Sequence, residues 1–157
     1  MKGMVGIGFS VKIETIGGNQ NLRPFKEHEN DAAYDIRNAE ENAVILKPGE
    51  RKLFSAGFRM ELPEGFEAQI RPRSGNALKK GITVLNSPGT IDSNYRGIVG
   101  VILYNASQEE VTINPGDKIA QMVINELPEV RLEFVDFISK ETERGEGGFG
   151  STGTVGK

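Results

Sequence analysis

Short runs of alternating apolar and polar residues constrain this fold more than any other feature of the sequence. Apolar side chains occupy every second position in four such runs, which span residues 9–13, 54–62, 66–70 and 130–134. Successive side chains of a β-strand point to opposite faces, so this alternation predicts strands with one face on a core and the other in water. Residues 98–104 and 118–127 are almost continuously apolar, which predicts strands buried on both faces.

Turn signals separate these runs. Pro-Gly pairs suit type II turns, because proline presets the first central residue and glycine takes the positive φ of the second; they stand at 48–49, 88–89 and 115–116. Many short strands with frequent turns predict an all-β sandwich or barrel. Residues 74–80 form the one segment with helical character, which Ser74 would cap and Gly81 would end.

The residues that are missing limit the chemistry. The sequence has no cysteine and a single histidine, His28, which excludes disulfide frameworks, thiolate nucleophiles and multi-histidine metal sites. Catalysis is expected to rely on carboxylates, hydroxyls, arginines, backbone amides or a hard cation such as Mg²⁺. His28 lies in a charged stretch, where we expect a solvated loop residue.

Length and charge bound the organisation of the chain and its partners. The 157 residues predict one β-rich domain over residues 1–139, followed by a glycine-rich segment over residues 140–157. The net charge of −3 argues against general nucleic-acid binding, and no apolar run reaches the ~20 residues of a membrane span. The first eleven residues favour a strand over a signal peptide, so a cytoplasmic protein is expected.

The C-terminal segment permits two interpretations. It holds six of the 20 glycines and few candidates for a core, which taken alone favours a disordered tail. The alternative is a flexible arm that orders on a ligand. Residues 145–150 match the pattern G-x-G-x-x-G, but a dinucleotide fingerprint must follow a strand and open a helix, and this context does not. The segment still offers hydrogen-bond donors suited to a phosphate, namely Arg144, Ser151 and Thr152. It also offers one ring suited to stacking, Phe149.

Four other residues are candidates with a structural alternative. Arg73 beside Ser74 could form an anion-binding corner, or could be a surface arginine next to a helix cap. Asp92 follows a predicted turn and is either a turn residue or a general base. Gln121 interrupts an apolar run and is either a structural bridge or a ligand contact. Asn86 could contact a base edge or complete a loop.

Together, five segments in this order resemble the five motifs of the trimeric dUTPase family. The resemblance extends over residues 9–153, and the third and fifth segments are its most specific parts. The segments are residues 33–36, 71–75, 86–97, 116–121 and 144–153, with the sequences AYDI, RPRSG, NSPGTIDSNYRG, GDKIAQ and RGEGGFGSTG.

The resemblance implies an all-β, jelly-roll-like subunit with one short helix and a flexible C-terminal arm. It implies a homotrimer in which three subunits share each active site and the arm closes over the site of a neighbour. The implied reaction converts dUTP and water to dUMP and pyrophosphate, with Mg²⁺ on the triphosphate. The product would serve thymidylate synthesis, and removal of dUTP would keep uracil out of DNA.

The same resemblance implies roles in the hairpin segment. Asp92 would be the catalytic carboxylate that activates the water attacking the α-phosphorus. Tyr95 would lie under the deoxyribose and leave no room for a 2′-hydroxyl. Asn86 and the hairpin residues Thr90 and Ile91 would contact the uracil edge.

The remaining motifs would bind the triphosphate and close the site. Arg73, Ser74, Gly75 and Gln121 would hold the phosphates, and Asp35 would bind Mg²⁺ through water. From the arm, Phe149 would stack on uracil, while phosphate contacts would come from Arg144, Gly150, Ser151 and Thr152.

The sequence departs from the family pattern at three positions. Ala33, Asn76 and Ile98 stand where the family usually has Gly, Leu and Glu.

A dCTP deaminase shares the fold, but its catalytic Glu would fall at the apolar Ile102. A non-catalytic binding module would need neither Asp92 nor the arm. Hydrolysis of dUTP is therefore the favoured function.

Overall fold

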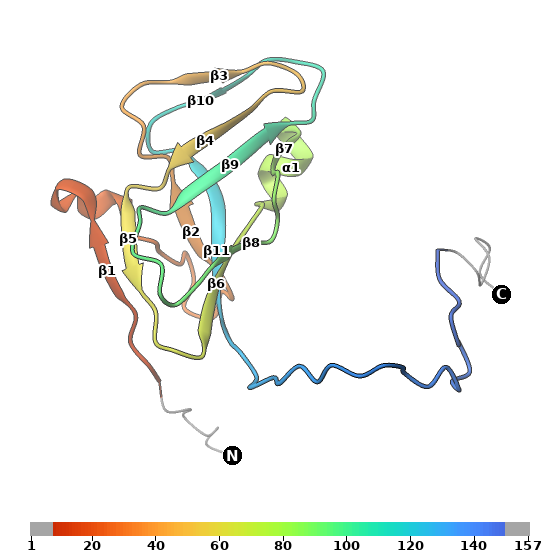
Figure 1. Ribbon diagram of the computed structural model, residues 1–157. Helices are drawn as coiled ribbons and strands as arrows, with labels where there is room; N and C mark the ends of the chain where they lie inside the picture. Colours follow the sequence, from red (N-terminus) through yellow and green to blue (C-terminus); the bar gives the residue numbers. More distant parts are fainter. Residues whose placement is uncertain (1–7, 150–157) are drawn as a thin grey trace.

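The computed structural model describes residues 8–149, which form eleven strands, one α-helix and two short 3-10 turns (Figure 1). The helix α1 spans Ser74–Lys80, and the turns span Ile16–Gly18 and Gln20–Leu22. The strands are β1 (Lys12–Thr15), β2 (Tyr34–Arg37), β3 (Val44–Leu46), β4 (Arg51–Ser55), β5 (Phe58–Glu61), β6 (Phe66–Arg71), β7 (Ile82–Val84), β8 (Gly89–Ile91), β9 (Gly100–Asn105), β10 (Val111–Ile113) and β11 (Lys118–Glu126).

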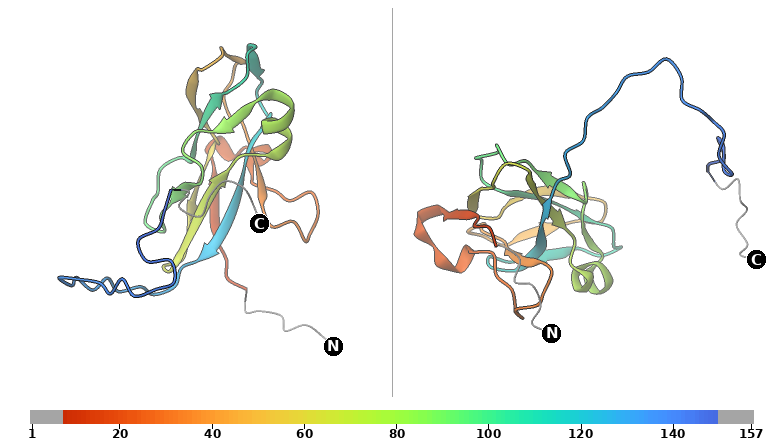
Figure 2. Two further views of the ribbon diagram at one scale, coloured as in Figure 1. Left: turned by 90° about the vertical axis from the view of Figure 1, so that its right-hand side faces the viewer. Right: turned by 90° about the horizontal axis from the view of Figure 1, so that it is seen from below.

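Every strand pairing is antiparallel, and most join strands that are distant in the sequence. A four-stranded sheet has the order β2-β11-β6-β8, and a three-stranded sheet has the order β4-β9-β7. Two further pairs, β1 with β5 and β10 with β3, complete the body (Figure 2). Long connections between antiparallel strands are the mark of a jelly roll, so the predicted all-β, jelly-roll-like class is confirmed.

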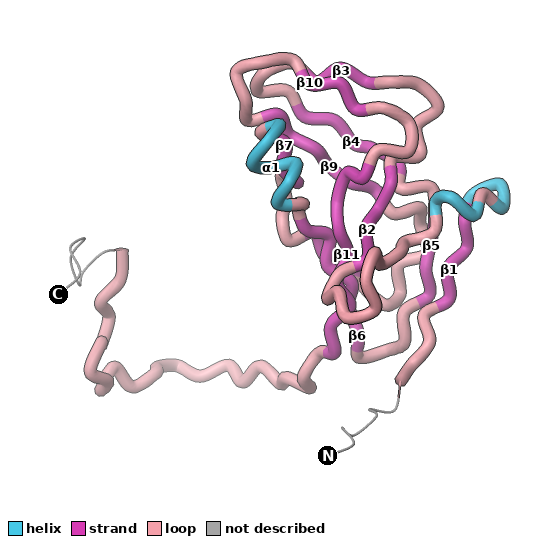
Figure 3. The backbone as a smooth tube through the Cα atoms, turned by 180° about the vertical axis from the view of Figure 1, so that it is seen from behind, coloured by secondary structure: helices cyan, strands magenta, loops and turns pink. Residues whose placement is uncertain are grey.

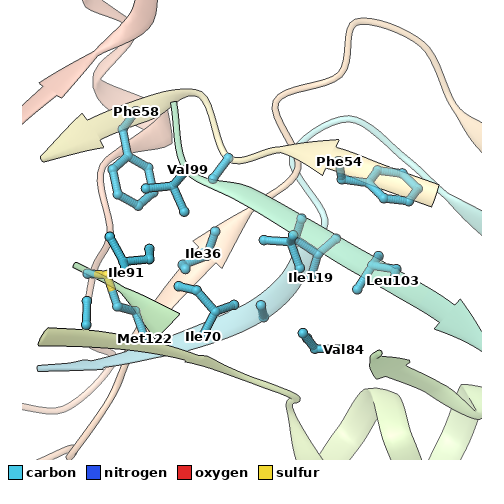
Figure 4. Close-up of a cluster of buried hydrophobic side chains, with 14 of the residues drawn as sticks. Ile36, Phe54, Phe58, Ile70, Val84, Ile91, Val99, Leu103, Ile119 and Met122 are labelled. Atoms are coloured by element: carbon cyan, nitrogen blue, oxygen red, sulfur yellow. The ribbon is translucent and has the colours of Figure 1, made fainter. Parts of the chain in front are cut away.

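The core lies between the two larger sheets. Figure 4 shows Phe54 and Leu103 from the three-stranded sheet in one cluster with Ile36, Ile70 and Met122 from the four-stranded sheet. All five side chains are at most 3% exposed. Burial of so many apolar side chains is the main force that holds the two sheets together.

The alternation over residues 54–62 predicts burial correctly but not the strand. All five apolar side chains of the run are buried, yet β4 ends at Ser55 and β5 begins at Phe58. Gly57 makes the break with a φ of 71°, and a Cβ there would lie 2.5 Å from Leu22 Cδ1 and 2.6 Å from Ala39 Cβ. The chain can therefore change sheets without changing which face is buried.

The helix agrees with its prediction except at its N-terminus. It ends at Gly81, whose φ is 65°. Ser74 is the first helical residue and not the cap; Arg73 occupies the cap position, and its side chain makes no capping hydrogen bond. The helix is tied to the sheet instead, because Asn76 Nδ2 donates to the carbonyl of Lys118 at 2.9 Å. This tie comes from a residue at which the chain departs from its family pattern.

Three predicted strands need correction. The run 9–13 becomes a strand only at Lys12, and residues 1–7 lie outside the described residues. The run 98–104 starts pairing at Gly100, and its burial alternates instead of covering both faces. Along β11, Ile119, Ala120 and Met122 are buried, residues 123–125 are half-buried and Glu126 is exposed.

The run 130–134 is not a strand. Residues 127–149 contain no strand and extend away from the body, as Figures 1 and 3 show from opposite sides. Val130 is 69% exposed and Phe134 is 93% exposed. A strand needs a partner for its backbone hydrogen bonds, and this subunit offers none along this path. No helix in the described part of the chain is long and apolar enough to cross a membrane.

Candidate active site

Three distant segments meet in one cavity of about 430 Å³. Its lining includes five of the residues predicted to hold phosphates or Mg²⁺, namely Asp35, Arg73, Ser74, Gly75 and Gln121, but not the predicted arm residue Arg144. His28, expected in a solvated loop, is exposed and lines the same cavity with Glu27 and Asp31. The structure therefore brings these predicted residues together within a single subunit.

Strand register explains the meeting. In the four-stranded sheet β11 lies between β2 and β6, so Gln121 pairs with Asp35 on one side and with Arg71 on the other. Figure 3 shows β2 and β11 side by side. Arg73 follows β6 by two residues and starts α1 at the end of the same sheet. The three adjacent strands therefore place a carboxylate, an amide and, just after β6, a guanidinium at one end of the sheet.

An ion-pair network holds the charged residues of the cavity. Arg73 Nε donates to Asp35 Oδ1 at 2.8 Å, and Lys118 Nζ lies 3.2 Å from Asp35 Oδ2. Lys118 also donates to Glu27 Oε1. The Asp35 side chain is only 14% exposed, so these charge-assisted contacts replace most of its hydration. The carboxylate is thereby fixed between two cations.

Lys118 and Glu27 were not among the residues predicted from the sequence. The pKa of Lys118 lies above its ordinary value, chiefly because Glu27 accepts its hydrogen bond; partial burial opposes this, and Asp35 adds to it. A raised pKa keeps the ammonium protonated throughout the neutral range. No local pattern links them, because Glu27 lies 91 positions before Lys118 in the sequence.

Gln121 acts as a structural bridge in this structure. Its Nε2 donates to the carbonyl of Pro72 at 2.8 Å, which ties β11 to the turn that carries Arg73. The side chain is half-buried and still lines the cavity. The bridging interpretation is therefore confirmed, and it leaves room for a ligand contact.

Asp92 lies in a different hollow. It follows β8 and lines a cavity of about 620 Å³ together with Glu64, Glu67, Asn94 and Arg96. The two cavities share no lining residue. One subunit therefore does not place the predicted base and the predicted phosphate ligands in a common pocket.

Tyr95 is held over the turn after Asp92. Its hydroxyl donates to the carbonyl of Ile98 at 3.0 Å, and its backbone N–H donates to the carbonyl of Asp92 at 3.1 Å. A Cβ on Gly97 would lie 2.2 Å from Tyr95 Oη, so only glycine fits beneath the ring. The tyrosine is about half-exposed and presents a fixed aromatic surface.

The hairpin residues differ in what they can offer a ligand. Thr90 is exposed and pairs with Gln69, whereas Ile91 is buried and pairs with Ala68. Ile91 can therefore contact a ligand through its backbone but not through its side chain. A Cβ on Gly89 would lie 3.3 Å from Asn86 Nδ2, so this glycine allows Asn86 to fold across the hairpin.

The arm residues lie away from both cavities. Arg144 Nε donates to the carbonyl of Gly147 at 2.7 Å, and the Phe149 side chain is fully exposed. Figures 1 and 3 show this segment far from the sheets of its own subunit. The structure does not bring these two residues to the other predicted ligands. Gly150, Ser151 and Thr152 lie outside the described residues.

The Asp35 carboxylate is a suitable ligand type for Mg²⁺. Within residues 8–149, no three histidines or carboxylates gather closely enough to hold an ion by themselves. Mg²⁺ prefers oxygen ligands and keeps several waters, so it commonly uses one or two carboxylates together with substrate phosphates. The Asp35 carboxylate lies in a cavity lined by groups suited to bind phosphates, and this combination matches the ligands that Mg²⁺ uses.

Comparison with known proteins identifies the family. A dUTPase family model matches residues 22–153. A deoxyuridine 5′-triphosphate nucleotidohydrolase of Clostridium kluyveri is 54% identical over 134 residues, covering 85% of this chain and 92% of that protein. The dUTPase of Staphylococcus bacteriophage 80alpha with dUPNHPP has a TM-score of 0.76 at 27% identity, covering 92% of this chain and 99% of that chain.

A second solved structure adds a likeness in fold. It is a mutant dUTPase from phage phi11 of S. aureus, described for its coordination of a structural Mg(II) ion. The TM-score is 0.72 at 24% identity, over 83% of this chain and 99% of that chain. The order of the motifs, the jelly-roll topology and the family match over most of the chain lead to one conclusion: this chain belongs to the dUTPase family.

Proposed function

We propose that this dUTPase-family enzyme hydrolyses dUTP to dUMP and pyrophosphate, with water as the nucleophile. The observation that carries the proposal is the cavity in which Arg73, Ser74, Gly75 and Gln121 surround the Asp35 carboxylate. A triphosphate requires neutralisation of charge and positioning for in-line attack more than covalent chemistry. The match to the dUTPase family model, over residues 22–153, includes every residue that lines this cavity.

The catalytic step assigns one role to each group. Asp92 accepts a proton from the water that attacks the α-phosphorus, and pyrophosphate leaves on the opposite side. Arg73 donates hydrogen bonds to phosphate oxygens and holds the triphosphate in the orientation required for in-line attack. Asp35 would hold Mg²⁺ through water, and that ion would supply further neutralisation of the triphosphate charge.

The base and sugar contacts supply specificity. Asn86 and the backbone of the 86–92 hairpin would pair with the uracil edge. The rigid Tyr95 ring would lie under the deoxyribose and clash with a 2′-hydroxyl, which is a repulsive means of discrimination. Phe149 would stack on uracil, while Arg144, Gly150, Ser151 and Thr152 would close over the phosphates.

A homotrimer with shared sites would complete the arrangement. Asp92 and the phosphate cavity are separate hollows in one subunit, and the segment 127–149 leaves its own body. Apolar side chains along this segment are exposed, which favours a second copy as their partner. Residues 1–139 would form the domain and residues 140–157 the arm. The substrate is a free nucleotide, so the proposal includes a cytoplasmic location and no nucleic-acid or membrane partner.

Hydrolysis of dUTP compared with UTP, dTTP and dCTP tests the proposal. We expect pyrophosphate from dUTP alone and no ammonia from dCTP, because β9 carries the apolar Ile102 where a deaminase needs its acid-base group. Asp92→Asn should reduce kcat about 10²- to 10⁴-fold and leave binding of dUpNHpp intact. Absence of dUTP turnover with Mg²⁺ present would favour a binding module, and release of ammonia would favour a deaminase.

A further inference from the structure

The two cations that hold Asp35 stand in different positions relative to the cavity. Arg73 Nε contacts Asp35 Oδ1 at 2.8 Å and lines the cavity. Lys118 Nζ lies 3.2 Å from Asp35 Oδ2 but is not among the lining residues. A ligand that enters the cavity therefore meets Arg73 directly, whereas Lys118 lies behind two lining residues, Asp35 and Glu27.

The two cations also differ in how firmly they are held. Lys118 forms an ion pair with Glu27, and its Nζ lies 4.8 Å from the centre of the Phe25 ring. Its carbonyl accepts a hydrogen bond from Asn76. Among the described residues, Asp35 is the one acidic partner of Arg73. Lys118 thus has two carboxylate partners and a ring beside it, while Arg73 has one carboxylate partner, to which its Nε and Nη2 both donate.

This difference decides what happens when a triphosphate binds. Phosphate oxygens compete with Asp35 for the Arg73 guanidinium, which is suited to both. Once Arg73 turns to the phosphates, the poorly exposed Asp35 carboxylate would lose its closest charge partner. An unpaired charge in such a place is strongly unfavourable. Lys118 is placed to prevent that state.

We propose that Lys118, tethered by Glu27, is a positioning residue that keeps the Asp35 carboxylate paired and oriented toward the hydrated Mg²⁺ of the nucleotide while Arg73 moves to the phosphates. The inference rests on the proposed function, because it concerns the same triphosphate site. It adds two residues to that site and couples nucleotide binding to the metal. Outer-shell partners of this kind commonly change metal affinity or activity 10- to 100-fold when they are removed, by general experience with metal sites.

Calorimetry with dUpNHpp tests the coupling directly. The measured quantity is the ratio of the dissociation constant without Mg²⁺ to that with Mg²⁺. Lys118→Met, which keeps the aliphatic stem, should lower this ratio about tenfold. Lys118→Arg should restore most of it, and Glu27→Gln should lower it by a smaller factor in the same direction.

Arg37→Met is the matched control. The Arg37 guanidinium lies 4.5 Å from the centre of the same Phe25 ring and makes no contact with Asp35 within the described structure. This variant removes a cation from the same ring, so its ratio should equal that of the wild type. An equal loss in Arg37→Met and Lys118→Met would overturn the proposal, because the ring platform and not Asp35 would then be responsible.

A double-mutant cycle with Asp35→Asn isolates the route of action. If Lys118 works through Asp35, Lys118→Met should have no further effect on the ratio in the Asp35→Asn background. An equal loss in both backgrounds would overturn the proposal. Thermal unfolding accompanies each variant; should Lys118→Met not fold, an unchanged ratio in Glu27→Gln overturns the inference. A wild-type protein that neither binds dUpNHpp nor hydrolyses dUTP would instead reject the proposed function.

Discussion

Two segments with the same pattern have opposite fates in this molecule. Apolar residues alternate with polar ones over both 54–62 and 130–134. In the first segment Phe54 and Phe58 are completely buried, whereas in the second Phe134 is 93% exposed. Alternation therefore specifies which side chains share a face, whereas a neighbouring strand decides whether that face is covered.

The same contrast separates the two parts of the proposed active site. The cavity around Asp35 is built by three adjacent strands whose hydrogen bonds set the register of Gln121. The arm residues Arg144 and Phe149 have no such support from their own subunit. One part is organised within the single subunit, and the other is not.

The largest effect is expected when the unsupported region is removed. Deletion of residues 143–157 should reduce kcat/KM on the order of 10²-fold or more, because the proposed phosphate and base contacts of the arm are lost. The thermal unfolding temperature should hardly change, since residues 143–149, the described part of the deleted segment, lie outside the core. Steady-state kinetics and calorimetric unfolding measure the two quantities, and unchanged kinetics would remove the arm from the site.

Phe58→Ala and Phe134→Ser test the two alternating segments as a pair. Loss of the buried Phe58 ring should lower the free energy of unfolding by about 3–5 kcal/mol at every protein concentration. Phe134→Ser should act only through self-association, so its unfolding temperature should depend more steeply on protein concentration than that of the wild type. Denaturant unfolding at several concentrations separates them. A concentration-independent loss in Phe134→Ser would mean that this ring packs on its own subunit.

Mixed oligomers sharpen the contrast between the regions. Asp92→Asn subunits with an intact arm, refolded with equal amounts of subunits lacking residues 143–157, should recover activity. Random assembly of a trimer with shared sites gives about a quarter of the sites both an intact Asp92 and an intact arm. Each variant refolded alone is the control. No recovery would show that base and arm come from the same subunit.

The smallest effect is expected at a solvated pair in the well-paired region. Lys12 and Glu61 face each other across β1 and β5 with Nζ and Oε1 3.1 Å apart, and both side chains are largely exposed. Lys12→Ala should change the free energy of unfolding by less than about 0.5 kcal/mol, because solvent screens the pair. Denaturant titration measures this change, and a loss above about 1 kcal/mol would assign β1 a larger part in holding the core.

Much of the architecture could be predicted from local patterns. The helix at 74–80, the burial of Phe54, Phe58 and Met60, and the all-β class follow from spacing that each strand or helix imposes on its own residues. The motif residues that line the cavity around Asp35 were also predicted, by resemblance to a family. Each of these predictions depends on neighbours within a few positions of the chain or on the order of short motifs.

Other features depend on contacts between distant residues, and no local pattern carried them. The break at Gly57 reflects the approach of Leu22 and Ala39, and the Lys118 network joins residues that are 91 positions apart. Ser74 was expected to cap α1, but the turn after β6 places Arg73 there instead. Sequence alone could not show which of several nearby charges would meet.

By itself, the sequence determined the periodicity of the strands, the positions of the turns, the chemistry left open by the absence of cysteine, and the family. Only the tertiary structure decided that Gln121 lies opposite Asp35, that Lys118 and Glu27 belong to the network around that carboxylate, and that residues 130–134 stay unpaired. The physical reason is that side-chain direction is a property of each strand, whereas register, ion pairing and coverage are properties of two segments that the fold must first bring together.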